Sequence, residues 1–584
     1  MTPGSRARVL VLVAQAVVAI GAVVMLWVNL GASLTEVRLL LAWWLGGWGL
    51  LVGWAWWKYR LSLYHLEALF GLVAGAILLY GGGLDLAVLK WVFAGFWVVV
   101  VALEVTAAGG GDGLLSPWGM AATAMAAVVT ITFPSALVVE FAALASVWAA
   151  VVGLLVLTRG LALARASRPP AAPRGRLRRA VSVGIPGLVF VLVALGFGQV
   201  MANTAAADAR QRVLAPFYEV PPDLAPGEPG SVIRSTQVEF DGLDGRAFRV
   251  LYRTEDEFAR PTVSSGLIFA PREAGSNHPV IAWAHGTVGL GEVCAPSRDG
   301  DFLRHTSWIN DALARGFVVA ATDYAGAGGT GNGEKYMVLA EQGRDVVNSV
   351  RAALDLPETG AGPTYATYGE SQGGAVSLAA AALSPAYAPE LELIAAGGVA
   401  AASDLAAILS QKWDRPLATW LLGPHILRAY TRHYPHLKVD EILTEAGRNH
   451  YVEIADDSCV FDLLGALLNP QMGRLLTRDP TTDPDWNAAL VANQAPDPPP
   501  GLPVFAGHGL ADPLIDPGIT AALVERYCAA GSAVNTHWME GVEHIGSSND
   551  GAPAYLDWLG AIQRDEQPAN HCGEPLPVPP VTAP

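Results

Sequence analysis

The chain has 584 residues, 52% of them hydrophobic, and a formal net charge of −16 at pH 7. Residues 1–200 hold 13 Lys and Arg against 6 Asp and Glu, whereas residues 201–584 hold 24 against 47. The length allows two or three domains, and the acidic second part gives no support to nucleic-acid binding.

Apolar runs of the length that crosses a bilayer fill the first 200 residues. Seven helices are expected, although the number is open by one or two, chiefly at the fifth and sixth. The first run is too long for a cleaved signal peptide, and others follow it. Residues 1–200 are therefore predicted to form an all-α polytopic membrane domain. The expected spans are Val9–Leu30, Val37–Trp57, Leu63–Tyr80, Ala87–Ala108, Trp118–Phe133, Leu137–Leu157 and Val181–Val200.

Basic residues predict the orientation of this domain. They precede the first span, follow the second and lie between the sixth and seventh, which are loops on one side of a seven-span domain. The N-terminus is therefore expected in the cytoplasm, and everything after Val200 outside. Acidic side chains in membranes can mark ion paths, but Glu67, Glu104 and Glu140 lie near predicted helix ends, which favours the membrane interface.

The acidic part alternates strands and helices after a linker over 201–222. Strands are expected at 237–240, 246–253, 266–270, 280–284, 317–322, up to 368, 393–396, 502–506 and 534–539, with helices over 302–315, 336–354 and 375–383. This order predicts a doubly wound, mostly parallel α/β sheet over 223–572. A helical insertion over about 404–500 is expected to cap the site, the alternative being an ornament elsewhere. Residues 573–584 are a Pro-rich tail.

The sequence Gly369-Glu370-Ser371-Gln372-Gly373 lies between a strand and an Ala-rich helix. A serine at such a strand–turn–helix elbow projects its hydroxyl above the sheet, and the flanking glycines suit the crowded turn. A helix that begins there points backbone N–H groups and its positive dipole end at developing negative charge. Ser371 is therefore the predicted nucleophile, although the motif by itself also fits a plain Gly-rich turn.

A serine nucleophile needs a base, and the base needs an orienting acid. Asp512 follows a late strand and His544 follows the last one, which gives the chain order Ser, Asp, His that this elbow type uses. Asp516 in the same loop is a rival for the acid. His508 and His537 are rivals for the base, but His544 is better placed, because it follows the last strand.

The oxyanion of the tetrahedral intermediate needs two donors. The backbone N–H of Gln372 is expected to be one, and that of Thr287 in the His285-Gly286-Thr287 loop the other. His285 is expected to hold this loop rather than to transfer protons. The glycines over 326–331 match G-x-G-x-x-G, but the stretch about 20 residues on, where a dinucleotide site needs an acidic residue at a strand end, is the interior of an expected helix. No nucleotide site is therefore expected.

All four cysteines, Cys294, Cys459, Cys528 and Cys572, lie after residue 200. An even number in one region suggests disulfides in an oxidising compartment, and four free buried thiols are the alternative. No Cys or His cluster indicates a metal, and no cofactor is expected.

Residues 215–572 resemble the secretory lipase family of α/β-hydrolases. The resemblance rests on Pro216-Phe217-Tyr218, Trp283-Ala284-His285-Gly286-Thr287 with Cys294, Asp323-Tyr324-Ala325-Gly326, the Ser371 elbow, and the Asp512 and His544 segments. It implies an acyl-ester substrate such as a triacylglycerol, a Ser371–His544–Asp512 triad, and disulfides Cys528–Cys572 and Cys294–Cys459. Seven membrane spans depart from the simple signal peptide of secreted lipases.

The sequence thus predicts a membrane-anchored, extracytoplasmic serine ester hydrolase with a lipid or other acyl-ester substrate. An acyltransferase or a peptidase with the same triad are alternatives within enzymes. A membrane sensor whose hydrolase domain only binds a ligand is the alternative outside them.

Overall fold

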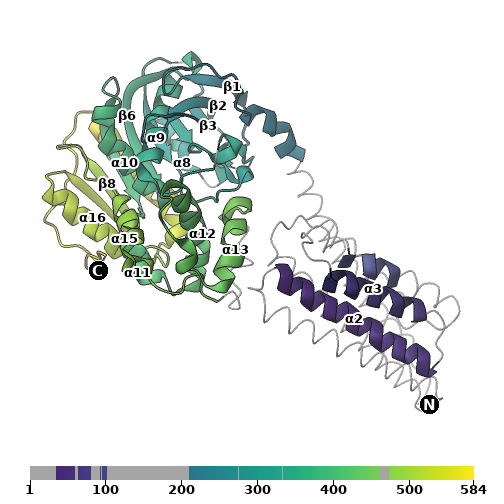
Figure 1. Cartoon of the computed structure of the whole chain (residues 1–584). Helices are drawn as coiled ribbons and strands as arrows, with labels where there is room; N and C mark the ends of the chain where they lie inside the picture. The colour runs from purple at the N-terminus through teal and green to yellow at the C-terminus, as the bar shows by residue number, and fades with distance from the viewer. Residues whose placement is uncertain are drawn as a thin grey trace, which may run out of the picture. The chain divides into compact units, whose positions relative to one another are not determined.

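The computed structural model describes residues 34–59, 64–80, 92–93, 95–100 and 209–583, except 274, 301, 305, 332 and 461–472 (Figure 1). The chain divides into two compact units, one of residues 1–210 with 469–473 and one of 211–468 with 474–584.

Two helices of the first unit coincide with the second and third expected membrane spans. They are α2 (Leu34–Tyr59) and α3 (Tyr64–Tyr80). Across the described residues, however, no helix combines the length and the apolar character needed to cross a bilayer. The two spans expected here are therefore not supported: α3 has 17 residues, and in α2 many Gly and Trp residues lower the mean hydropathy. Of the other five, four lie outside the described residues and Ala87–Ala108 is described only in part.

A nine-stranded sheet forms the centre of the second unit, in the order β1-β2-β3-β5-β4-β6-β7-β8-β9. The first three strands pair antiparallel, and β3 also pairs antiparallel with β5. The remaining neighbours are parallel, as expected for a doubly wound sheet. The strands are β1 (Val232–Val238), β2 (Gly245–Glu255), β3 (Pro261–Pro271), β4 (His278–Ala284), β5 (Val318–Thr322), β6 (Ala361–Glu370), β7 (Glu392–Val399), β8 (Val504–Gly509) and β9 (Val534–Met539).

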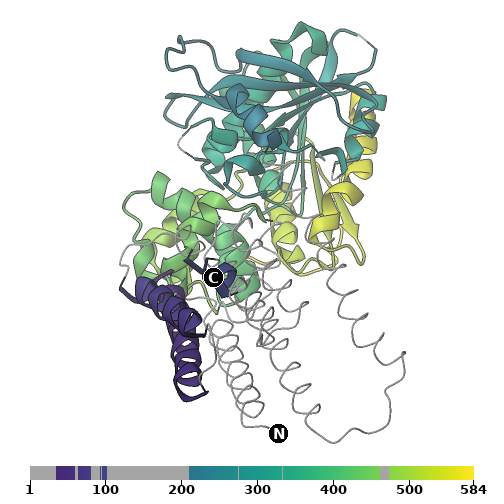
Figure 2. The ribbon, with the colours of Figure 1, turned by 90° about the vertical axis from the view of Figure 1, so that its right-hand side faces the viewer.

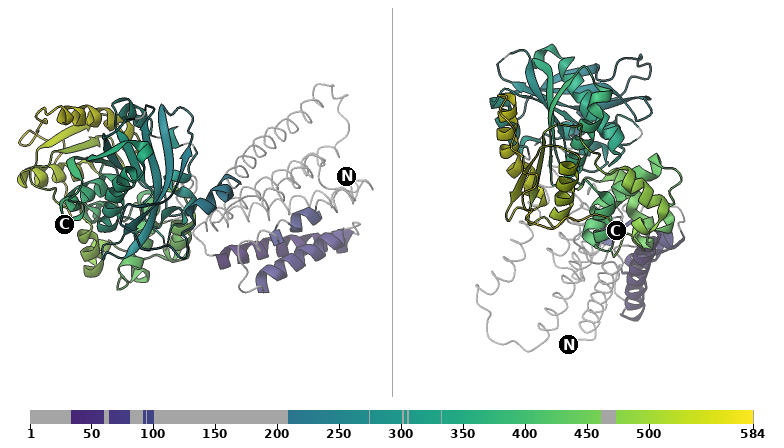
Figure 3. Two further views of the ribbon diagram at one scale, coloured as in Figure 1. Left: turned by 90° about the horizontal axis from the view of Figure 1, so that it is seen from above. Right: turned by 90° about the vertical axis from the view of Figure 1, so that its left-hand side faces the viewer.

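Helices cover both faces of this sheet (Figures 1 and 3). On one face α8 (Trp308–Ala314) and α17 (Ser547–Gln563) bury aromatic side chains such as Trp308 and Tyr555 against the strands. On the other face lie α9 (Leu339–Leu354), α10 (Gln372–Tyr387) and α16 (Pro517–Ala529). Leu378 of α10 and Leu523 of α16 belong to a second core cluster. The central strands read as continuous apolar runs because they are buried on both sides.

The described residues between β7 and β8 form mainly helices, which lie in one group (Figure 2). They are α11 (Leu405–Lys412), α12 (Pro416–His433), α13 (Glu445–Asp457) and α15 (Pro484–Ala492). These cap helices contact loops that follow the carboxyl ends of the strands. The Tyr430 hydroxyl donates to the Met337 carbonyl, and the Val460 N–H donates to the Val288 carbonyl.

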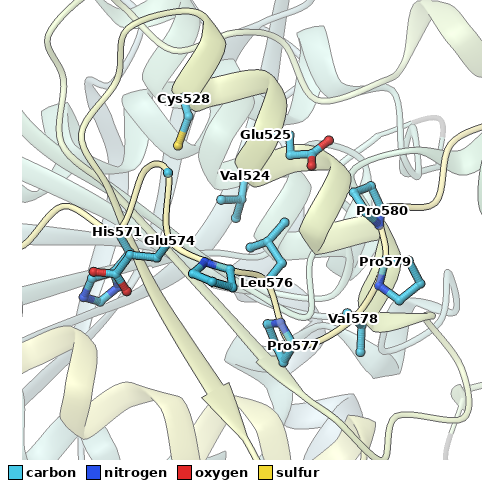
Figure 4. Close-up of a pocket in the computed structure, with 12 residues that line it drawn as sticks. Val524, Glu525, Cys528, His571, Glu574, Leu576, Pro577, Val578, Pro579 and Pro580 are labelled. Atoms are coloured by element: carbon cyan, nitrogen blue, oxygen red, sulfur yellow. The ribbon is translucent and has the colours of Figure 1, made fainter.

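The two disulfides pair Cys294 with Cys459 and Cys528 with Cys572, as the family resemblance implied. The first joins the loop after β4 to the cap. The second holds the Pro-rich tail on α16, where the Val581 N–H donates to the Gly518 carbonyl. Tail and helix line an open pocket of about 580 Å³, whose lining includes Val524, Glu525, Leu576 and Pro579 (Figure 4).

Candidate active site

Ser371 sits between β6 and α10 in a backbone conformation that L-residues rarely adopt, with φ 55° and ψ −118°. Such strain at a non-glycine residue persists where the surrounding structure enforces it, commonly at a functional site. Here the Ser371 N–H donates to the Val399 carbonyl, and its own carbonyl accepts from the Ala402 N–H. Both bonds anchor the elbow to the end of β7.

The glycines on either side of the serine have no room for a side chain, as the motif predicted. A Cβ on Gly369 would lie 2.2 Å from the Gly373 carbonyl oxygen. A Cβ on Gly373 would lie 1.9 Å from the carbonyl oxygen of Ala284, the last residue of β4. The elbow therefore packs directly on the strand that leads into the His285-Gly286-Thr287 loop.

Three side chains meet at this elbow in a continuous hydrogen-bonded row. Ser371 Oγ lies 2.9 Å from His544 Nε2, and His544 Nδ1 lies 2.6 Å from Asp512 Oδ2. The three residues follow β6, β9 and β8, whose carboxyl ends share one edge of the parallel sheet. The structure thus brings together the three residues that the sequence selected as nucleophile, base and acid.

Asp512 is a buried carboxylate that four N–H groups hold. The backbone N–H groups of Leu514 and Ile515 donate to Oδ1, at 2.8 and 2.9 Å. His508 and His544 lie against Oδ2. Burial by itself raises the pKa of Asp512, but the hydrogen bonds from the two imidazoles outweigh it, so this pKa lies well below its usual value.

The rival candidates have other roles. Asp516 caps α16, where its carboxylate accepts from the Gly518 N–H at 2.8 Å. His537 lies within β9 and packs against Phe505. His508 does contact Asp512, although from a different element than His544. No motif or spacing in the sequence indicates this contact.

A second carboxyl, Glu370, fixes the loop that was expected to carry an oxyanion donor. Its two oxygens accept from the Gly286 N–H at 2.9 Å and from Trp283 Nε1 at 3.1 Å. Burial raises the pKa of Glu370 to about 7. His285 is buried in the same loop, its Nδ1 lies 2.6 Å from the Gly286 carbonyl, and burial lowers its pKa.

The two expected oxyanion donors are Gln372, two residues after Glu370, and Thr287, next to Gly286. Gln372 is the first residue of α10, and its side-chain amide donates to the buried Glu334 at 2.9 Å. Thr287 follows the β4 strand, and its hydroxyl lies 2.6 Å from that of Tyr336. Burial raises the pKa of Glu334 to about 8, so near neutral pH this acid is largely protonated. The sequence offered no motif for Glu334 or Tyr336, which lie in the irregular segment before α9.

The glycine run over 326–331 does not form a dinucleotide-binding turn. Helix α9 begins at Leu339 rather than on the glycines, and three of them adopt positive φ values in a short loop. Gly328 is one of them, and a Cβ there would in addition press on Tyr218 and Ala295.

Within the described part of the chain, one group of side chains is close enough to share a cation: Glu257, Glu341 and His433. His433 Nε2 lies 2.9 Å from Glu257, and its Nδ1 lies 3.2 Å from Glu341. The two nitrogens face different carboxylates, so both sides of the ring have a partner. The ring is thus held between the two carboxylates.

A parallel sheet with a strained serine elbow and an Asp and a His at the same edge defines an α/β-hydrolase. Candida antarctica lipase A shows the same fold at a TM-score of 0.52 and 19% identity, with 62% of this chain and 88% of that chain covered.

Residues 304–570 match the model of the secretory lipase family. Among relatives, a probable inactive lipase of Mycobacterium tuberculosis is 28% identical over 59% of this chain and 80% of its own. Lipase A of Arthroderma benhamiae is 28% identical over 59% and 78%. A secreted triacylglycerol lipase of Malassezia globosa is 26% identical over 66% and 89%. The second part of the chain therefore resembles the secretory lipases, and the protein is a lipase-like hydrolase.

Proposed function

We propose that the chain cleaves acyl esters with Ser371 as nucleophile, through an acyl-enzyme intermediate. The observation that carries the proposal is the hydrogen-bonded row from Ser371 Oγ through His544 to Asp512. One of the relatives is named a probable inactive lipase, so similarity alone does not decide activity. Here all three side chains are present, and the serine adopts the strained elbow conformation.

In the proposed reaction Ser371 Oγ attacks the acyl carbonyl while His544 Nε2 takes its proton. Asp512 accepts from His544 Nδ1–H, which keeps Nε2 free to act as the base and stabilises the imidazolium that forms. His544 then returns the proton to the leaving alcohol oxygen. Water attacks the acyl-enzyme by the same steps and releases the acid.

The negative oxygen of each tetrahedral intermediate needs fixed donors. We assign this role to the backbone N–H groups of Gln372 and Thr287. Two observations support the assignment. Helix α10 begins at Gln372, so its N-terminus points at the site. Glu370 accepts from the N–H of Gly286, the residue before Thr287, and so holds that loop in place.

The proposed substrate is a lipid or other acyl ester, held beneath the cap helices. Relatives named triacylglycerol lipases support this substrate class. Acyl transfer to an alcohol acceptor uses the same triad and is the second candidate; it predicts an ester product that appears only when the acceptor is supplied.

We place the catalytic unit outside the cytoplasm. Its two disulfides persist in an oxidising compartment, and several relatives are named as secreted. Attachment to the cell membrane through residues 1–200, with the N-terminus in the cytoplasm, stays a prediction from the sequence. Cell fractionation together with protease treatment of intact cells tests both parts: digestion of the catalytic unit is expected without lysis.

The activity is tested with the purified full chain and p-nitrophenyl esters of increasing acyl length. Ser371→Ala is expected to lower turnover by about 10⁴-fold or more, as for other triad nucleophiles. Ser235→Ala, on the exposed face of β1, is the matched control and is expected to retain wild-type turnover. Turnover that persists in Ser371→Ala overturns the proposal, and folded protein without turnover on any ester supports a binding role.

A further inference from the structure

Asp512 has a second histidine partner that the proposed mechanism does not use. His508 Nε2 lies 3.1 Å from Asp512 Oδ2, the same oxygen that His544 Nδ1 approaches to 2.6 Å. The His508 and Asp512 side chains are both fully buried. Among the described residues, two titratable side chains contact this carboxylate: an imidazole from β8 and one from the loop after β9.

The surroundings of His508 fix where its proton lies. Its Nε2 faces two acceptors, Asp512 Oδ2 and the Ile515 carbonyl oxygen at 3.2 Å. A lone pair on Nε2 would be repelled by both, so Nε2 carries hydrogen. The other nitrogen, Nδ1, lies 2.7 Å from the hydroxyl of Thr520, which can donate to it. His508 therefore occupies the Nε2–H tautomer, supported by a residue of α16.

The contacts form one row across the edge of the sheet. Thr520 donates to His508, His508 and His544 both donate to Asp512, and Ser371 lies next to His544. Because one oxygen accepts from both imidazoles, each hydrogen bond draws on the same negative charge. A bond from His508 therefore reduces the charge that Asp512 offers to His544.

We propose that His508 is a positioning residue of the hydrolase site, which orients the Asp512 carboxylate and limits how strongly that carboxylate stabilises protonated His544. The inference rests on the proposed function, since it assigns His544 as the base. A base must lose its proton near the working pH, and too strong a carboxylate partner keeps it protonated. His508 thus helps to keep His544 neutral and ready to accept the Ser371 proton.

Three variants separate positioning from simple packing. His508→Leu fills a similar volume without a donor, whereas His508→Gln can present its amide N–H near the position of Nε2. Thr520→Val removes the hydroxyl that favours the Nε2–H tautomer. His537→Leu makes the same histidine-to-leucine change on the neighbouring strand β9 and serves as the control.

The readout is the pH profile of kcat/KM for ester hydrolysis by the full chain. His508→Leu is expected to lower kcat/KM about 10- to 100-fold at pH 7 and to move its acid limb up by about 0.5 to 1 pH unit. Thr520→Val is expected to move the limb in the same direction by less. His508→Gln is expected to restore most of the activity and the wild-type limb, and His537→Leu to keep the wild-type limb.

A merely structural role predicts lower activity with an unmoved acid limb in His508→Leu, and that result overturns the proposal. The titration of the His544 imidazole, followed by NMR of histidine-labelled protein, gives a second readout that needs no turnover. It is expected to occur at higher pH in His508→Leu than in wild type. If wild type has no Ser371-dependent turnover, the proposed function fails, while an unchanged His544 titration refutes the role of His508 separately.

Discussion

Histidines and carboxylates meet at two places in the second unit, with opposite stoichiometry. At Asp512 one carboxylate accepts from two imidazoles, His508 and His544. At His433 one imidazole lies between two carboxylates, Glu257 and Glu341. The first group gathers residues at the carboxyl edge of the sheet. The second joins α12 of the cap to α9 and to the loop between β2 and β3.

The two groups are therefore expected to have different roles, the first in catalysis and the second in stability. At Asp512 the charge lies on a fixed carboxylate, and the mobile proton belongs to His544, which also contacts Ser371. At His433 the carboxylates are the flanking partners, and the ring packs between Phe258 and Tyr434. The first group is expected to control the rate, and the second to hold the cap on the sheet.

Asp512→Asn gives the largest expected effect. The amide cannot accept from His544 as the carboxylate does, and it favours the wrong imidazole tautomer, so kcat is expected to fall by about 10⁴-fold. Asp516→Asn is the control within the same loop and is expected to keep kcat within a few-fold. An equal loss in both variants would show that the loop, rather than the acid, is what the activity requires.

Removal of the Cys294–Cys459 disulfide tests the covalent tie between cap and core. The Cys294–Cys459 disulfide closes a loop with a sequence separation of 165, against 44 for Cys528–Cys572. Since the entropy lost by the unfolded chain grows with loop length, removal of Cys294–Cys459 is expected to cost about 5 kcal/mol, about 1 kcal/mol more than removal of Cys528–Cys572. Denaturant unfolding of the two double Cys→Ser variants measures both costs. The reverse order would contradict the entropic explanation.

His433→Gln weakens the second histidine group without touching the first. Glutamine cannot face both carboxylates with the two ring nitrogens as His433 does. The loss is expected to be about 2 kcal/mol of unfolding free energy, because Glu257 is partly exposed. The acid limb of kcat/KM is expected to stay in place, in contrast to His508→Leu. His436→Gln, three residues further, is the matched control. A shifted limb in His433→Gln would break the distinction between the two groups.

Glu334→Gln tests the buried acid next to Gln372. Burial raises the pKa of Glu334 from 4.5 to about 8. Between these two pH values the folded state therefore binds more protons than the unfolded state. Stability is therefore expected to fall as pH rises through this window, by about 1 kcal/mol per pH unit from this group. Glutamine cannot ionise, so the variant is expected to lose this slope while it still accepts from Gln372. An unchanged slope would place the titration elsewhere.

Much of the fold was predictable, because strand burial and chain order leave clear patterns. All nine expected strands exist, although β1 begins earlier than expected and the helix expected over 302–315 begins with the separate short turn Phe302–Arg304 before α8. Three site residues were predictable because each follows a strand of a parallel sheet. His508, Glu334 and Tyr336 were not, because their roles come from contacts across distant elements.

By itself, the sequence determined the parallel sheet, the serine elbow and the chain order of Ser371, Asp512 and His544. Local causes suffice for these features: apolar runs form buried strands, and glycines permit the crowded turn. Only the tertiary structure decided that His508 shares an oxygen of Asp512 with His544, and that His433 lies between two carboxylates. Such contacts join residues that are far apart in the chain, and periodicity and spacing carry no information about which side chains then meet.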